Sequence, residues 1–195
     1  MSTRPHLAIV IGSTRPGRHA EIVARWVHGL ASGRDDATVE LVDLAEHVLP
    51  MYDEPRPPMA GCYTHPHTHR WAETVAAFDG FAFVTPEYNH APPAVLKNAL
   101  DYLFAEWNDK ACGFISYGMT GGGVRAVEHL RLVAAELRMA DVRSQVTLSL
   151  ADDWTDHPDP TTFCPRDFQA RDVHTTFDQI TTWARALRPL RRPTA

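Results

Sequence analysis

The sequence predicts a three-layer α/β sandwich, in which one parallel β-sheet lies between two layers of helices. Short apolar segments typical of buried strands alternate with amphipathic segments of helical spacing along nearly the whole chain. There are five such pairs, without internal repeats and without a second core. The 195 residues therefore fit a single domain over residues 1–195, with its core in residues 6–187 and a frayed tail at 188–195.

The expected strands are short and mostly apolar. Residues 80–85 are almost continuously apolar, as in a strand that is buried on both faces of a sheet. Turns and loops with Gly or Pro follow several of these segments. The five strands are expected over residues 7–11, 39–44, 80–85, 111–117 and 145–150.

The expected helices show apolar residues at helical spacing. The first covers Ile22 to Leu30 and stops at Ser32-Gly33. A long proline-rich loop over residues 49–67 then precedes the second helix, and long loops in compact domains are often functional. The remaining helices are expected around residues 71–78, over 92–107 and 124–139, and in a final segment that ends near Leu187.

Composition narrows the function classes. A net charge of −5 argues against nucleic acid as the main partner, because binding to phosphate backbones needs a basic surface. There is no apolar run of about 18 residues, and the first six residues do not resemble a signal peptide. We therefore expect a cytoplasmic protein without a membrane partner. Three distant cysteines, Cys62, Cys112 and Cys164, are expected to be free thiols.

The loop after the first strand has the features of a phosphate-binding loop. It reads Gly-Ser-Thr-Arg-Pro-Gly-Arg over residues 12–18 and opens a helix, whose N-terminus offers free N–H groups and a partial positive charge. It lacks the second glycine of a dinucleotide-binding fingerprint and the Lys-Ser/Thr pair of a Walker loop. An ordinary strand–helix turn remains the alternative. The candidate ligands are Ser13, Thr14, Arg15, Arg18 and His19.

Two further loops follow strands and carry unusual residues. Residues 86–90 read Pro-Glu-Tyr-Asn-His, and residues 118–123 form a glycine-rich turn. In parallel sheets, ligands bind beyond the carboxyl ends of the strands. With the strand order 2-1-3-4-5, the three loops surround one crevice. His90 is then either a substrate contact or a solvated loop histidine.

These loops resemble the NADPH-dependent FMN reductase family, flavodoxin-like flavoproteins that include quinone-reducing members. The resemblance covers about residues 6–150 and is carried by three segments: Gly-Ser-Thr-Arg at 12–15, Thr-Pro-Glu-Tyr-Asn at 85–89 with Leu-Lys-Asn-Ala-Leu-Asp at 96–101, and the glycines before Arg125-Ala126. It implies a flavodoxin-like fold with a five-stranded parallel sheet in the order 2-1-3-4-5.

The resemblance also implies a cofactor site. FMN is expected with its phosphate on residues 13–18 and its ring against the other two loops. Many relatives carry Ser and Asn where this chain has Arg18 and Ala20, so Arg18 is expected to replace both. The residues expected around the ring are Pro86, Glu87, Tyr88, Asn89, Gly118, Gly121, Gly122 and Gly123.

The function that this site implies is an NAD(P)H-dependent oxidoreductase. NADPH is expected to reduce FMN and leave, after which free flavin, a quinone or a similar small acceptor takes the electrons in a ping-pong cycle. No protein residue is nominated as catalytic. The alternatives are a flavodoxin-type electron carrier that docks with protein partners and a flavin-binding regulator without turnover.

Two features of the chain lie outside these loops. Three histidines at 65, 67 and 69 alternate near Cys62, but no metal motif supports them, so no metal site is expected. The 92–107 segment is apolar around most of its circumference, which favours a homodimer or a dimer of dimers. The alternative is coverage by the long loop of the same subunit. The apolar residues are Val95, Leu96, Leu100, Tyr102, Leu103, Phe104 and Trp107.

Overall fold

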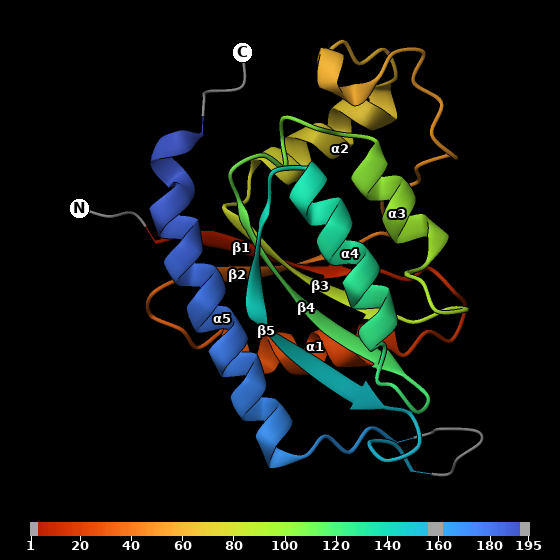
Figure 1. Ribbon diagram of the computed structural model, residues 1–195, viewed down its shortest axis with the longest axis vertical. Helices are drawn as coiled ribbons and strands as arrows, with labels where there is room; N and C mark the ends of the chain where they lie inside the picture. The colour runs from red at the N-terminus through yellow and green to blue at the C-terminus, as the bar shows by residue number, and fades with distance from the viewer. Residues whose placement is uncertain (1–3, 156–161, 192–195) are drawn as a thin grey trace.

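A computed structural model describes residues 4–155 and 162–191 and confirms the predicted fold class (Figure 1). Within these residues, five parallel strands form one sheet in the order β2-β1-β3-β4-β5. The strands are β1 (His6–Ile11), β2 (Thr38–Asp43), β3 (Gly80–Pro86), β4 (Ala111–Gly118) and β5 (Ala140–Ser149). The helices are α1 (Ala20–Ala31), α2 (Pro66–Ala76), α3 (Ala94–Asp101), α4 (Val124–Glu136) and α5 (Asp167–Leu187), with 3-10 turns η1 (Pro58–Ala60) and η2 (Arg188–Leu190).

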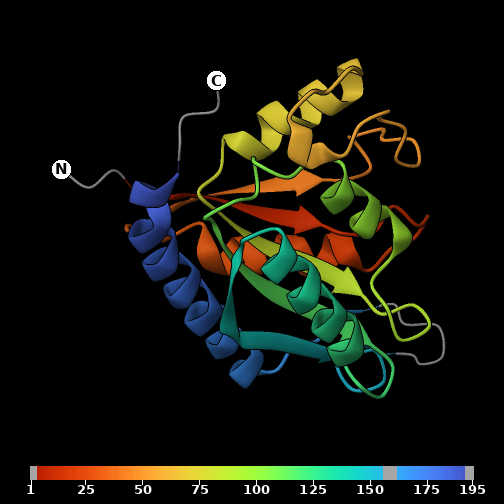
Figure 2. The ribbon, with the colours of Figure 1, turned by 45° about the horizontal axis from the view of Figure 1, so that its top comes forward.

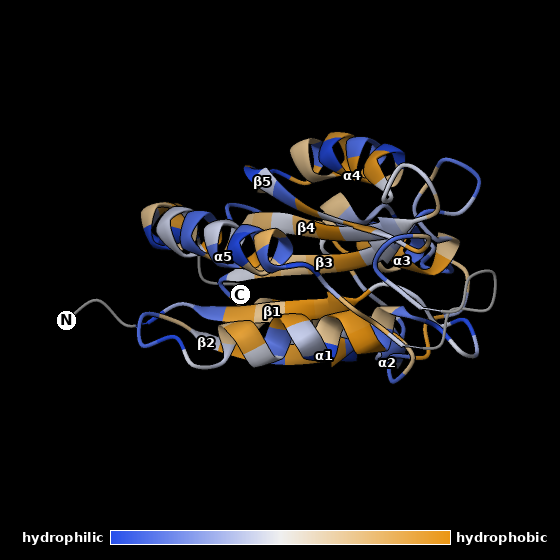
Figure 3. Cartoon of the chain, turned by 90° about the horizontal axis from the view of Figure 1, so that it is seen from below, coloured by the Kyte–Doolittle hydropathy of each residue, from blue (hydrophilic) through white to orange (hydrophobic). Residues whose placement is uncertain are grey.

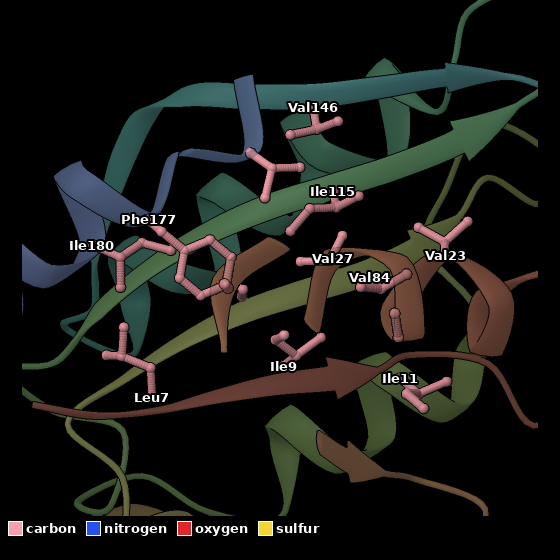
Figure 4. Packing of buried hydrophobic residues seen from close by; sticks show 14 of the residues in the cluster. Leu7, Ile9, Ile11, Val23, Val27, Val84, Ile115, Val146, Phe177 and Ile180 are labelled. Atoms are coloured by element: carbon pink, nitrogen blue, oxygen red, sulfur yellow. The ribbon is translucent and has the colours of Figure 1, made fainter. Parts of the chain in front are cut away.

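Helices cover both faces of the sheet, with α1 and α5 on one face and α2, α3 and α4 on the other (Figure 3). Side chains alternate between the faces along each strand, so β1 contributes to two separate cores. Leu7, Ile9 and Ile11 pack with α1 and α5, where Phe177 and Ile180 approach Leu7 (Figure 4). Ala8 and Val10 pack on the other face with α2, α3 and α4. This two-faced burial explains the continuous apolar runs of the central strands.

The third helix is shorter than predicted. The sequence indicates residues 92–107, but α3 ends at Asp101. The chain then turns inward, so that Trp107 lies buried against Trp71 and Phe81. The Asn108 side chain donates to the carbonyls of Phe104 and Leu137 at 2.6 and 3.1 Å. Burial of aromatic side chains therefore outweighs helical spacing here.

The fifth strand is longer than predicted. It begins at Ala140, five positions before the predicted start, and α4 ends at Glu136 rather than at residue 139. The pairing of β4 with β5 shifts register between Cys112 and Phe114. At Gly113 between them, an added Cβ would lie 2.9 Å from α5 side chains. The first residues of β5 are only partly buried, and several of them are polar. They therefore lack the apolar pattern by which a strand is recognised in the sequence.

The long loop is an ordered scaffold. Asn98 of α3 donates to the carbonyl of Pro50 at 2.7 Å and accepts the N–H of Tyr52 at 2.9 Å. The buried carboxylate of Glu54 accepts the N–H groups of Thr64 and His65 at 2.9 and 3.0 Å. His65 is the N-cap of α2, so Glu54 satisfies donors that the start of this helix leaves free.

Glu54 is expected to make the stability of the protein acid-sensitive. Burial raises the pKa of this carboxyl, but the hydrogen bonds from Thr64 and His65 outweigh burial and lower the pKa to about 2. A depressed folded-state pKa contributes stability above pH 4.5, which is lost as the pH falls toward 2. In urea unfolding, we expect Glu54→Gln to be less stable at pH 7 and to lose less stability between pH 5 and 3 than the wild type. Parallel losses would contradict this role.

The apolar residues of α3 and of the segment after it are covered within the chain. Leu96, Leu100, Tyr102, Leu103 and Trp107 are buried within one chain, and Val95 and Phe104 pack against them. This burial fits the alternative, coverage by the long loop within one subunit, which stays a prediction. Homodimer formation stays a prediction, but these residues no longer argue for it.

Two smaller expectations concern histidines and cysteines. His67 and His69 lie on α2 rather than in the loop, and His67 Nε2 lies 3.0 Å from Asp53 Oδ1. Among residues 4–155 and 162–191, no group of three or more metal-binding side chains is placed to hold an ion. The three cysteines are free, as predicted.

The C-terminal tail is ordered further than predicted. The Asp79 carboxylate accepts hydrogen bonds from Arg188 and Arg191, each at 2.6 Å, and from the N–H of His6 at 2.8 Å. Residues 188–191 are therefore tied to the sheet rather than frayed, while 192–195 lie outside the described residues. In the described part of the chain, no helix is long and apolar enough to cross a membrane.

Candidate functional site

Three loops meet at the carboxyl edge of the sheet. Figure 2 shows the loops after β1, β3 and β4 gathered on the right-hand side of the view. The register explains this, because Ile11 pairs with Val84 and Pro86 with Tyr117. A hydrogen bond of 3.1 Å joins the Ser13 and Tyr88 hydroxyls across the first two loops. The strand order β2-β1-β3-β4-β5 therefore brings the candidate residues of the three loops together.

The loop after β1 is shaped by close backbone contact. The N–H of Gly12 donates to the carbonyl of Val84 at 2.8 Å, and a Cβ on Gly12 would lie 2.7 Å from that oxygen. Only glycine fits there. Ser13 is buried, whereas Thr14 and Arg15 are exposed. Among the described residues, the N–H groups of Ser13, Thr14 and Gly17 have no acceptor, so they are free to bind a ligand.

Arg18 is placed differently from its predicted role. Its guanidinium pairs with Asp43 at the end of β2 and lies 3.7 Å from Glu21. Its buried Nε has no partner in the described chain. Its positive charge is thus neutralised by carboxylates of the protein itself. Arg15 is the other cation of this loop and can bind an anionic ligand.

His19 forms the N-cap position of α1 and packs against aromatic side chains. Its ring meets Trp154 edge-on at a centroid distance of 5.3 Å and Tyr117 at 6.3 Å. Burial, and next the charge of Arg15, lower the pKa of His19 below its usual value. A neutral imidazole therefore lies beside the free N–H groups at physiological pH.

The loop after β3 is a tight turn. Tyr88 and Ala91 exchange two backbone hydrogen bonds of 2.9 and 3.1 Å. Between them, Asn89 and His90 have φ angles of +50° and +69°, a conformation that non-glycine residues rarely adopt. Glu87, which precedes the turn, pairs with Arg125 of α4. Glu87 thus links two loops, which its predicted place at a cofactor ring did not anticipate.

The glycine-rich turn after β4 depends on the absence of side chains. Gly122 and Gly123 have φ angles of +56° and +80°. A Cβ on Gly123 would lie 2.8 Å from the Ser116 Cβ and 2.9 Å from the Tyr117 carbonyl oxygen. At Gly118, a Cβ would lie 3.0 Å from the Gly123 nitrogen. The bare backbone permits close approach of a flat ligand.

The donor set fits a phosphorylated, planar ligand. Free N–H groups, two hydroxyls and one available arginine lie at the start of α1, where an anion is favoured. A turn with an aromatic residue and a turn of glycines lie beside it.

A family model described as NADPH-dependent FMN reductase matches residues 5–153. The chain belongs to this family. It is 41% identical over 151 residues to an NAD(P)H-dependent FMN reductase of Schizosaccharomyces pombe. The matched region covers 76% of this chain and 75% of that protein. It is 33% identical over 142 residues to a 2-hydroxy-1,4-benzoquinone reductase of a Burkholderia species, covering 67% and 70%.

Solved structures agree on the fold. FerB of Paracoccus denitrificans, a flavoenzyme NAD(P)H:(acceptor) oxidoreductase, superposes with a TM-score of 0.69 at 20% identity, over 93% of this chain and 98% of that one. The FMN reductase family membership makes the protein an oxidoreductase that uses FMN and NAD(P)H. These predictions of family, fold, enzyme class and cofactors are confirmed.

Sequence reasoning missed two residues of this candidate site. The glycine motif before Arg125 indicates no role for this residue, whose contacts with Glu87 and His90 join loops far apart in the sequence. Trp154 was not singled out, although it packs on His19. No local pattern signals either residue, because both contacts depend on the tertiary fold.

Proposed function

We propose that the chain holds the FMN phosphate at the start of α1. The Ser13 and Thr14 hydroxyls, the free N–H groups and Arg15 supply the donors, with neutral His19 beside them. Arg18 supports the loop through Asp43 rather than acting as the main charge partner. The observation that carries this proposal is the set of N–H groups without acceptors next to an available arginine.

We further propose that the FMN ring lies against the loops after β3 and β4. Tyr88 and Asn89, with Pro86 before them, form one wall, and Gly118 and Gly121–123 form the other. Two charge-assisted hydrogen bonds of about 1.5–3 kcal/mol each fall short of the approximately 8 kcal/mol of micromolar binding, so ring contacts must add to them. When bound, the cofactor supplies hydride acceptance from NAD(P)H and electron transfer to an acceptor.

A small quinone or free flavin is the acceptor that we propose. The similarity to a benzoquinone reductase and to FMN reductases supports this class. The protein binds both substrates in turn at one face of the site, and no side chain is needed as acid or base for the hydride step.

The test mixes purified protein with FMN, NADPH and 1,4-benzoquinone and follows NADPH absorbance. We expect rapid NADPH consumption without any second protein, with parallel double-reciprocal plots when both substrates are varied. An electron carrier would consume NADPH only after a partner reductase is added. That result would exclude the proposed reductase.

We also propose that the protein acts in the cytoplasm as a homodimer or a dimer of dimers. Exposed apolar side chains on α4, Val124 and Leu132, would be covered by a second copy. Light scattering over a dilution series tests this, and a monomeric mass at all concentrations would exclude it.

A further inference from the structure

Glu87 performs a structural task at the start of α4. The N-cap of this helix is Gly123, which has no side chain to bind the first free N–H groups. The Glu87 carboxylate accepts the N–H of Arg125 at 3.1 Å and pairs with the Arg125 side chain. The Glu87 side chain is only 7% exposed, so the ion pair is shielded on one side. A residue from one loop therefore caps the helix that follows another loop.

Arg125 binds a second residue of the same turn. Its Nη1 lies 2.8 Å from Nε2 of His90. Because an arginine always donates, Nε2 of His90 must be the acceptor. One guanidinium thus contacts the residue before Tyr88 and the residue after Asn89. It brackets the turn from both sides.

The turn needs such support. Asn89 and His90 both lie in the left-handed region, and only the Tyr88–Ala91 pair closes the turn through the backbone. Strained backbone persists where surrounding contacts fix it, and here the bracketing arginine is that contact. The side chain of Arg125 is half-exposed, so it lies at the rim of the site and not in the core.

We propose that Arg125 is a positioning residue of the flavin site. By binding Glu87 and His90 together, it holds the turn Tyr88–Ala91 against the start of α4 and forms the wall of the ring site before any cofactor binds. This rests on the proposed function, since the turn matters as a wall only if the ring lies there. A preformed wall lowers the ordering cost of binding.

The experiment compares Arg125→Ala, Arg125→Lys and the control Arg185→Ala. Arg185 is also an exposed arginine, but it binds the Asp36 carbonyl at 2.6 Å, far in the sequence from the three loops. Amide hydrogen exchange is measured on the flavin-free proteins for the peptide 87–91. The FMN dissociation constant and the visible circular dichroism of bound FMN are measured next.

For Arg125→Ala, we expect exchange in this peptide to rise about tenfold or more, FMN to bind roughly tenfold more weakly, and the dichroism of bound FMN to change. Lysine should restore little, because a point charge does not bridge two partners. Arg185→Ala should match the wild type in all three. Unchanged exchange in Arg125→Ala would show that Arg125 does not hold the turn. Faster exchange with unaltered FMN affinity and dichroism would show that Arg125 does not position the flavin site. A wild type that binds no FMN would instead refute the proposed function, because the exchange measurement does not involve flavin.

Discussion

Gly123→Ala is expected to destabilise the protein by roughly 2–4 kcal/mol and to abolish tight FMN binding. At φ +80°, an alanine is strained whatever space surrounds it. The new Cβ would also lie 2.8 Å from the Ser116 Cβ and 2.9 Å from a backbone oxygen of β4, neither of which can move freely. Urea unfolding and a fluorescence titration with FMN measure the two effects.

Gly121→Ala is the matched control for this change. Gly121 lies in the same turn, but its φ is not in the left-handed region, and the nearest atom to an added Cβ is a flexible arginine nitrogen at 3.5 Å. We expect its stability to stay within about 0.5 kcal/mol of the wild type. Equal losses at both positions would show that backbone geometry is not what the glycines provide.

Arg15→Ala is expected to weaken FMN binding by roughly 10- to 150-fold, the equivalent of one charge-assisted hydrogen bond of about 1.5–3 kcal/mol. Riboflavin lacks the phosphate, so its affinity should stay the same in this variant. Calorimetric titration with both ligands separates the phosphate contact from the ring contacts.

Arg18→Ala provides the comparison within the same loop. Because Arg18 already pairs with Asp43 and Glu21, its removal should cost less FMN affinity than removal of Arg15. If Arg18→Ala had the larger effect, the main charge partner of the phosphate would be Arg18 rather than Arg15. If Arg15→Ala weakened riboflavin as much as FMN, the phosphate assignment would fail.

The fold was predictable because its signals are local. Alternation of apolar strands and amphipathic helices depends on neighbouring residues only, and the central strands are buried on both faces. The failures have a tertiary cause. Trp107 is buried in the core beyond the end of α3, so the helix is shorter than its apolar residues indicate. The first residues of β5 are only partly buried and partly polar, so their sequence does not look like a strand.

The site was predictable in its location and less so in its contacts. The three loops could be recognised from their residues and the usual binding edge of parallel sheets. The sequence alone could not predict which partner each charged side chain binds. Arg18 binds Asp43, which is 25 positions away in the sequence, and Glu87 binds Arg125, which is 38 positions away. Such pairs arise from the packing of separate loops, which leaves no trace in local sequence.

The central claim is that the start of α1 holds the phosphate of FMN while the ring lies between the turns after β3 and β4. A crystal structure of the FMN complex tests it most directly. We expect phosphate oxygens within hydrogen-bond distance of Thr14 and Arg15, and the ring beside Tyr88 and Gly121–123. A phosphate bound elsewhere, or a ring outside these two turns, would contradict the account.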